Sequence, residues 1–218
     1  TVAKELSSAM APGLGEFLEQ HPSMAIHPCA TPGLQLRGTL SFHAQPSGKP
    51  EITDTYSLAI MVPPAFPASL PTVIETGGQI PRDKGYHVNS DDTLCLGSPL
   101  RLLLKLAKQP TLLGYADGCI VPYLYAISHK LRFGGPFVFD ELDHGAPGAL
   151  ADYMDLFGVK RPAQARTIWR LLGMKERHAN KNPCPCGCGQ RLGRCVFRKR
   201  LSEIRALASK KWFRENAL

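Results

Sequence analysis

The sequence predicts an α+β fold, in which a β-sheet forms first along the chain and helices follow it. Three segments before residue 77 alternate apolar and polar residues or are rich in β-branched residues, which is typical of strands. Beyond residue 98 the apolar residues recur at helical spacing instead. Because short connections join the three strand segments, we expect them to pair as an antiparallel meander.

The individual elements follow from apolar spacing and from the residues that interrupt it. Helices are predicted over 2–10 and 14–20, and His-Pro and Pro-Gly pairs then interrupt the chain as far as Gly33. The strands are expected over 34–42, 56–62 and 72–76, with a turn at 45–50 and a proline-rich connection at 63–71. Later helices are expected over 100–108, 111–130, 150–157 and 163–174. A final basic helix carries an apolar stripe from Leu201 to Trp212.

Composition limits the classes of protein to consider. The chain has 218 residues, 44% of them hydrophobic, which suits one large domain or one domain with a small appendage. Its apolar stretches are short and broken by charges, so we expect no transmembrane helix, no secretory signal and no membrane partner. Seven cysteines make a poor disulfide framework and favour reduced thiols in the cytoplasm. Cys29 and Cys119 are interpreted as structural thiols.

The net charge of +8 is distributed unevenly along the chain. Residues 1–159 carry 10 basic and 15 acidic side chains, whereas residues 160–218 carry 16 basic and 3 acidic ones. The change of sign predicts two parts, a body over 1–159 and a basic helical extension over 160–218. Such an extension favours nucleic acid or an acidic protein surface as a partner, although a solvated face that pairs with the acidic body explains the charge equally well.

The segment HVNSDDTLCLG, residues 87–97, gathers side chains that nucleophilic catalysis uses. A cysteine is the best side-chain nucleophile for holding an acyl group as a thioester, which makes Cys95 a candidate nucleophile; the alternative is a buried structural thiol. The amide of Asn89 can donate a hydrogen bond to the oxyanion that forms when an amine attacks the thioester. Asp91 and Asp92 are candidates for orienting or deprotonating an incoming lysine, or they simply form the turn.

This segment, together with YSLAIMVPPAFPASLPTVI at residues 56–74, resembles the ubiquitin-conjugating enzymes. The prolines after Phe66 and Leu70 fill the turn that the family places between two strands. The family's His-Pro-Asn and Cys-Leu pattern is matched, in kind and in order, at His87, Asn89, Cys95 and Leu96. Val88 stands in place of the family's proline and no Trp-x-Pro follows Cys95, which indicates a divergent bacterial branch.

The resemblance covers residues 1–145 and implies a ubiquitin-conjugating-enzyme (UBC-like) fold, with an antiparallel meander sheet and flanking helices. It implies that Cys95 carries an acyl group as a thioester, that Asn89 stabilises the oxyanion and that His87 organises the loop. The sequence has no Gly-rich loop of the kind that binds nucleotides, so we expect another protein to supply the activated acyl group.

Stand-alone proteins of this kind resemble those of short type II CBASS antiviral operons. The resemblance implies a cGAS/DncV-like nucleotidyltransferase as partner, whose C-terminus is conjugated to lysines of target proteins in bacterial immunity. Two other functions stay open. One is a non-catalytic adaptor with the same fold, and the other is a zinc-dependent nucleic-acid-binding protein, which would show a steep salt dependence of binding.

The stretch NPCPCGCGQRLGRC, residues 182–195, holds four of the seven cysteines and resembles the SEC-C zinc motif. The motif's first three ligand positions are matched by Cys184, Cys186 and Cys195. Val196 stands where the fourth ligand is expected, so Cys188 is the candidate for that place and His178 is a weaker one. Four thiolates would complete a closed structural zinc site, which would supply the folding energy of so small a module. A redox-active thiol cluster or a disulfide is the alternative.

Overall fold

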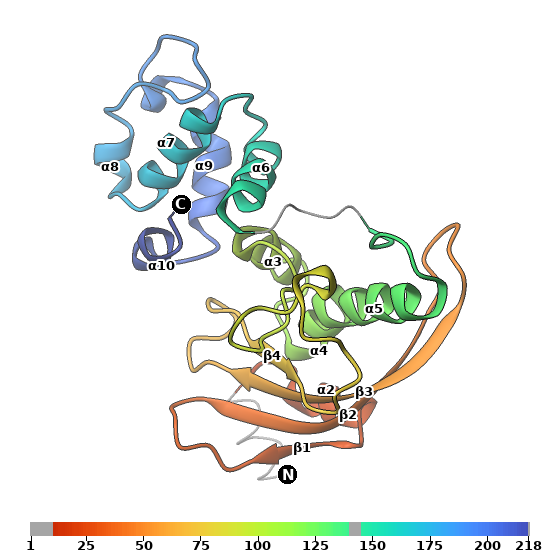
Figure 1. Cartoon of the computed structure of the whole chain (residues 1–218). Helices are drawn as coiled ribbons and strands as arrows, with labels where there is room; N and C mark the ends of the chain where they lie inside the picture. The colour runs from red at the N-terminus through yellow and green to blue at the C-terminus, as the bar shows by residue number, and fades with distance from the viewer. Residues whose placement is uncertain (1–10, 140–144, 218) are drawn as a thin grey trace. The chain divides into compact units, whose positions relative to one another are not determined.

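The computed structural model describes residues 11–139 and 145–217 (Figure 1). The helix predicted over residues 2–10 lies outside the described residues. The chain divides into two compact units, which are Thr1–Gly97 with Leu102–Glu141 and Ser98–Arg101 with Leu142–Leu218. A four-stranded antiparallel sheet with several helices confirms the predicted α+β class.

The first unit is built around the sheet, whose strands pair in the order β1-β2-β3-β4. Its strands are β1 (Met24–His27), β2 (Leu34–Ala44), β3 (Ile52–Val62) and β4 (Thr72–Glu75). Its helical elements are α2 (Leu14–Gln20), η1 (Lys84–Tyr86), α4 (Leu112–Tyr115), η2 (Ala116–Ile120), α5 (Val121–Phe133) and most of α3 (Pro99–Leu106). Three of the strands are those that the sequence predicts, and β1 precedes them.

Alternating burial explains why the two long strands pair as they do. In β2 the buried positions are every second residue at Leu34 and Leu36 and again at Leu40 and Phe42, so one face of the strand is apolar. Strand β3 pairs with β2 over its whole length and is buried in the same manner. Helix α5 packs against β3 and covers the apolar face of the sheet (Figure 1). The hydrophobic core of the first unit lies between them.

The helix predicted over 111–130 is present but is not uniform. The Oγ1 atom of Thr111 accepts a hydrogen bond from the Gly114 N–H at 3.0 Å and caps the start of α4. The segment η2 is a π-helical turn, after which α5 carries Pro122 in its first turn. A proline has no N–H to donate and displaces the preceding backbone, which a wider π turn accommodates. None of the described helices combines the length and the apolar character needed to cross a membrane.

The second unit is helical. Its helices are α6 (Gly145–Phe157), α7 (Pro162–Leu172), α8 (Glu176–Ala179), η3 (Leu192–Arg194), α9 (Phe197–Arg205) and α10 (Lys210–Glu215). Its core includes an aromatic cluster: Tyr153 and Trp169 stack with their ring centroids 4.4 Å apart, and Phe213 meets Trp169 edge-on at 5.7 Å. The predicted single final helix is wrong, because Ser209 caps a new helix by accepting a hydrogen bond from the Trp212 N–H at 3.1 Å.

Candidate functional site

The predicted Cys95 segment folds as a tight hairpin in the first unit. The Cys95 N–H donates to the carbonyl of His87 at 2.8 Å, and the Asn89 N–H donates to the carbonyl of Thr93 at 2.9 Å. These hydrogen bonds place His87 opposite Cys95 and Asn89 opposite Thr93. The structure therefore brings three of the predicted site residues into one short ladder.

The hairpin turns one face inward and the other outward. Val88 and Leu94 form a bridge and are both buried, and the Leu94 N–H donates to the carbonyl of Val73 in β4 at 2.8 Å. Because successive residues of an extended chain point to opposite faces, their neighbours Asn89 and Cys95 lie on the outward face. Diagonal neighbours in such a ladder are about 7–8 Å apart at their Cα atoms, a span that long side chains can bridge. The amide and the thiol thus share one face.

In this hairpin the side chains of Asn89 and Asp91 both form hydrogen bonds with Thr93. The Asn89 Nδ2 atom donates to the Thr93 Oγ1 atom at 3.0 Å, and that hydroxyl donates to the Asp91 carboxylate at 2.6 Å. The carboxylate also accepts from the Thr93 N–H at 3.2 Å, and these hydrogen bonds lower the pKa of Asp91. Asp91 is therefore a residue that shapes the turn in the structure as it stands.

His87 and Asp92 fix the two ends of the turn. Both have left-handed backbone conformations, with φ angles of 53° and 64°. The His87 ring packs edge-on against the Phe137 ring, with the two centroids 4.6 Å apart. Arg82 lies between two carboxylates, with its Nε 3.9 Å from Asp92 and its Nη2 3.6 Å from the buried Glu75. The loop is thereby tied to the end of β4.

The thiol of Cys95 is half-buried. Burial raises its pKa, and a hydrogen bond from the backbone of Gly97 opposes part of that increase. The resting thiol is therefore protonated at neutral pH and becomes a nucleophile only when its proton is removed. Cys119 is fully buried in η2 and Cys29 lies beside Thr31 before β2, so neither belongs to this hairpin.

The second predicted site is a cluster of four thiols in the second unit. The sulfur atoms of Cys184, Cys186, Cys188 and Cys195 all lie within 4.8 Å of one another. The Cys184–Cys186 separation is 3.2 Å and the Cys186–Cys195 separation is 3.7 Å. A tetrahedral zinc ion with thiolate ligands places its sulfurs about 3.8 Å apart, given bonds of about 2.3 Å. The four cysteines therefore could hold a metal ion, and Cys188 takes the place that the sequence left open, whereas His178 is not in the cluster.

A small hairpin positions the first three cysteines. Pro183 pairs with Arg191, and the Cys184 N–H donates to the carbonyl of Gln190 at 2.7 Å. Within the turn Gly187 and Gly189 have φ angles of 87° and 76°, which glycine adopts without strain. The chain can therefore fold back sharply enough for three alternate cysteines to face one point.

The fourth cysteine comes from the start of α9. The Phe197 N–H donates to the sulfur of Cys195 at 3.4 Å, and the Arg198 N–H donates to its carbonyl at 3.1 Å. In the cysteine hairpin, a hydrogen bond with the backbone of Gln190 lowers the pKa of Cys188 to about 7, which favours its thiolate.

Two residues that hold the sites in place were missed by the sequence analysis. Thr93 binds the side chains of both Asn89 and Asp91, and its only sequence signal is its place between a turn and the candidate nucleophile. Gln164 of α7 donates from its Nε2 atom to the carbonyl of Pro185 at 2.7 Å and so anchors the cysteine hairpin. No local pattern marks a glutamine for that role, because its partner lies far along the chain.

No protein-family model, curated protein or solved structure matches this chain. What the fold and the sites define is an α+β protein with a half-buried cysteine on a structured hairpin and a four-cysteine cluster that could bind metal.

Proposed function

We propose that the chain is a ubiquitin-conjugating-like enzyme, which carries the C-terminus of a partner protein as a thioester on Cys95 and transfers it to a lysine or another nucleophile. The observation that carries the proposal is the shared outward face of Cys95 and Asn89 on one hairpin. An antiparallel sheet flanked by helices is also the architecture that the sequence resemblance implies.

The proposed chemistry has two acyl transfers. In the first, the Cys95 thiol gives up its proton and the sulfur attacks the activated carbonyl of the donor, whose leaving group takes the proton as the new C–S bond forms. In the second, an amine attacks that thioester, the C–S bond breaks, and the Cys95 sulfur recovers a proton from the amine. The Asn89 amide leaves Thr93 and donates to the oxyanion that develops in this step.

The proposed partner is a cGAS/DncV-like nucleotidyltransferase, and the proposed setting is bacterial antiviral defence in the cytoplasm. Both rest on the resemblance to the stand-alone conjugating-enzyme-like proteins of short CBASS operons. We further infer that the metal of the four-cysteine cluster is structural zinc. Four sulfur ligands leave no open position for substrate, so its contribution is to hold the cysteine hairpin, which Gln164 ties to the start of α7, to the start of α9.

The test is a Cys95→Ser variant, because a serine forms an oxygen ester that reductant does not cleave. The chain is co-expressed with the nucleotidyltransferase and analysed by non-reducing electrophoresis and by intact mass. We expect a thiol-sensitive adduct with the wild-type chain, a thiol-resistant adduct with Cys95→Ser, and none with Cys95→Ala or with a partner shortened at its C-terminus. Cys29→Ser is the matched control, since it removes another half-buried thiol of the first unit, and we expect it to leave the adduct unchanged.

Asn89→Ala separates the two acyl transfers. We expect the thioester to form at an almost normal rate and its transfer to lysine to slow by about 10²-fold or more, as when an oxyanion donor is lost. A stable complex with the partner that has no adduct, and that persists in Cys95→Ala, would contradict the enzyme and leave a non-catalytic adaptor.

A further inference from the structure

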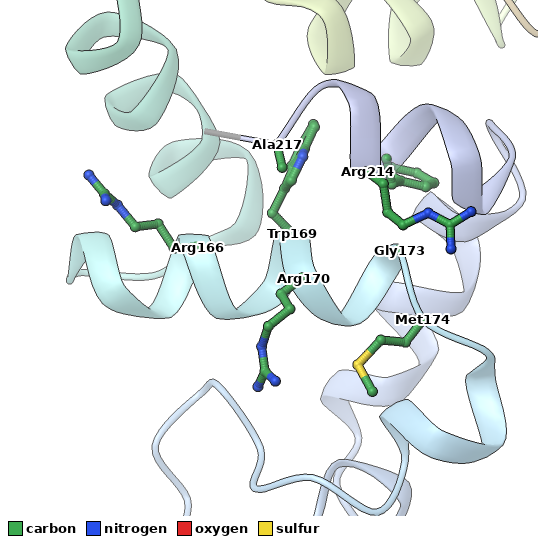
Figure 2. Close-up of a pocket in the computed structure, with 8 residues that line it drawn as sticks. Arg166, Trp169, Arg170, Gly173, Met174, Arg214 and Ala217 are labelled. Carbon is green, nitrogen blue, oxygen red and sulfur yellow. The ribbon is translucent and has the colours of Figure 1, made fainter.

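A cavity of about 310 Å³ in the second unit is lined by three arginines and an apolar wall (Figure 2). Arg166 and Arg170 come from one face of α7, and Arg214 comes from α10. The apolar lining includes Met174 and Phe213. The volume is at the lower end of the range of about 300–1,000 Å³ that is usual for ligand sites.

The three arginines have no partner of their own. Within the described residues, the guanidinium groups of Arg166, Arg170 and Arg214 make no hydrogen bond or ion pair, and no carboxylate side chain lines the cavity. The cavity lies in the part of the chain that carries 16 basic and 3 acidic residues. Unpaired guanidinium groups recognise carboxylates and phosphates through paired hydrogen bonds, so the cavity favours an anionic ligand.

A residue of the cavity wall also carries a buried donor that has no acceptor among the described residues. Trp169 is 2% exposed and lines the cavity, yet its Nε1 atom is buried without a hydrogen-bond partner. A buried N–H that lacks an acceptor costs about 1–3 kcal/mol, so native proteins seldom leave one unpaired. Because Trp169 lines the cavity, a ligand oxygen that comes within hydrogen-bond distance of this atom would satisfy it.

The packing around the cavity favours a chain of carboxylates over a nucleotide or a single phosphate as the anionic ligand. Trp169 is stacked on Tyr153 and meets Phe213 edge-on, so its ring faces are covered and a nucleotide base finds no free surface to stack on. Figure 2 shows the guanidinium groups of Arg166, Arg170 and Arg214 spread around the cavity and pointing in different directions. A single phosphate would need them to converge, whereas carboxylates spaced along a chain would not.

We propose that this cavity binds an acidic linear peptide of a partner protein, with one aliphatic side chain inserted between α7 and α10. The aliphatic side chain contacts Met174 and Phe213, while flanking glutamates or aspartates pair with the three arginines. A peptide carbonyl accepts from the Trp169 Nε1 atom. All of its residues belong to the second unit and none to the hairpin of Cys95, so the proposal does not rest on acyl transfer.

Tryptophan fluorescence of the full-length chain tests the proposal, because Trp169 and Trp212 are its two tryptophans. The Trp212→Phe variant isolates the emission of Trp169. The probe is a short blocked peptide of glutamates around a central leucine, and the control peptides replace the leucine by serine or the glutamates by glutamines. We expect saturable quenching or a shift of emission with the first peptide, and at least about tenfold weaker binding of both controls.

Matched charge changes locate the binding site. Arg170→Gln and Arg214→Gln each remove one charge from the cavity, and Arg198→Gln removes one from the exposed surface of α9, outside the cavity. We expect each cavity variant to weaken peptide binding about fivefold and Arg198→Gln to change it less than twofold. All three residues are exposed, so the variants are expected to fold, and an unchanged melting temperature confirms it.

Three results would overturn the proposal. One is equal weakening by Arg198→Gln and Arg170→Gln, which would show general attraction to a basic surface. Another is equally tight binding of a single-stranded oligonucleotide of matched charge, which would favour nucleic acid. The third is the absence of any change in Trp169 emission at peptide concentrations in the millimolar range.

Discussion

Two half-buried thiols of the first unit, Cys29 and Cys95, have opposite surroundings. The Cys29 sulfur lies 3.0 Å from the Thr31 hydroxyl, and hydrogen bonds from that residue lower the pKa of Cys29. No hydroxyl of the described part of the chain bonds to Cys95, and burial raises the pKa of this thiol. At neutral pH the larger thiolate fraction is therefore on Cys29, although no motif around Cys29 predicts a reactive thiol.

We expect iodoacetamide to alkylate Cys29 before Cys95 at pH 7.5. The thiolate is the reacting form, so each rate rises with pH until the thiol is ionised, and the Cys29 rate levels off at the lower pH. At a pH below both pKa values, the ratio of the two thiolate fractions is about tenfold for each unit by which the pKa values differ. Mass spectrometry of the two peptides across a pH series measures both curves.

Thr31→Val is the control for the alkylation order. It removes the hydroxyl, so the pKa of Cys29 should rise and its alkylation at pH 7.5 should slow, while Cys95 is unaffected. Identical pH profiles for Cys29 and Cys95 in the wild-type chain would contradict the environments described above.

At the same scale, the sequence predicted the members of the cysteine cluster but not the residues that contact the two sites. The spacing of Cys184, Cys186 and Cys188 predicts a metal site, because alternate cysteines in a glycine-rich turn can face one point. The contacts of Thr93 with Asn89 and of Gln164 with the carbonyl of Pro185 depend on side-chain directions, which spacing does not specify.

At the scale of elements, the start of α3 is tied to α6 by a buried carboxylate. Asp152 is 2% exposed and accepts hydrogen bonds from the Ser98 hydroxyl and from Arg101, whose Nε lies 2.7 Å from its Oδ1. The same arginine reaches the exposed Asp155 with Nη2–Oδ2 at 3.0 Å. All four residues belong to the second unit. The guanidinium of Arg101 therefore has one buried and one exposed carboxylate partner, and substituting each in turn measures how burial changes the contribution to stability.

We expect Asp152→Asn to reduce the free energy of unfolding by about 2 kcal/mol, because it weakens a buried, charge-assisted network. Asp155→Asn, the matched control, should cost at most about 0.5 kcal/mol, since its carboxylate is solvated. Urea unfolding followed by tryptophan emission measures both, as Trp169 lies in the same unit. Equal losses for the two variants would show that burial of Asp152 does not set its contribution.

The strands were predicted correctly where apolar and polar residues alternate over a long stretch. Strands β2 and β3 follow from alternation, whereas β1 was missed because Met24 is its only buried residue and the strand shows no alternation. The interruption of the last helix at Ser209 was also missed. From the sequence, a serine beside an apolar stripe is expected on the exposed face of the helix. Only the hydrogen bond that its hydroxyl accepts from the Trp212 N–H shows that Ser209 is a helix cap.

At the scale of the whole molecule, the two units differ in what holds them together. The first has a sheet-and-helix core, and the second contains both an aromatic cluster and the four-cysteine cluster. Both tryptophans lie in the second unit, and the buried Cys119 lies in the first. The chain therefore carries a natural reporter for the folding of each unit.

We expect the purified chain to contain one zinc ion, which Cys186→Ser removes and Cys29→Ser does not. Removal of the metal by a chelator should shift tryptophan emission to longer wavelength, because the cysteine hairpin and the start of α9 lose the ion that joins them. Cys119 should stay protected from alkylation under the same conditions, because the core of the first unit does not include the cluster. Metal analysis, fluorescence and mass spectrometry of one sample give the three readings.

The two possible failures of this experiment have different meanings. Unchanged emission after complete loss of zinc would show that the aromatic core of Tyr153 and Trp169 supports the second unit without metal. Rapid alkylation of Cys119 would show that the two units unfold as one, so that zinc stabilises the entire chain. The predicted result, a red shift with Cys119 still protected, requires that the metal stabilises the second unit alone.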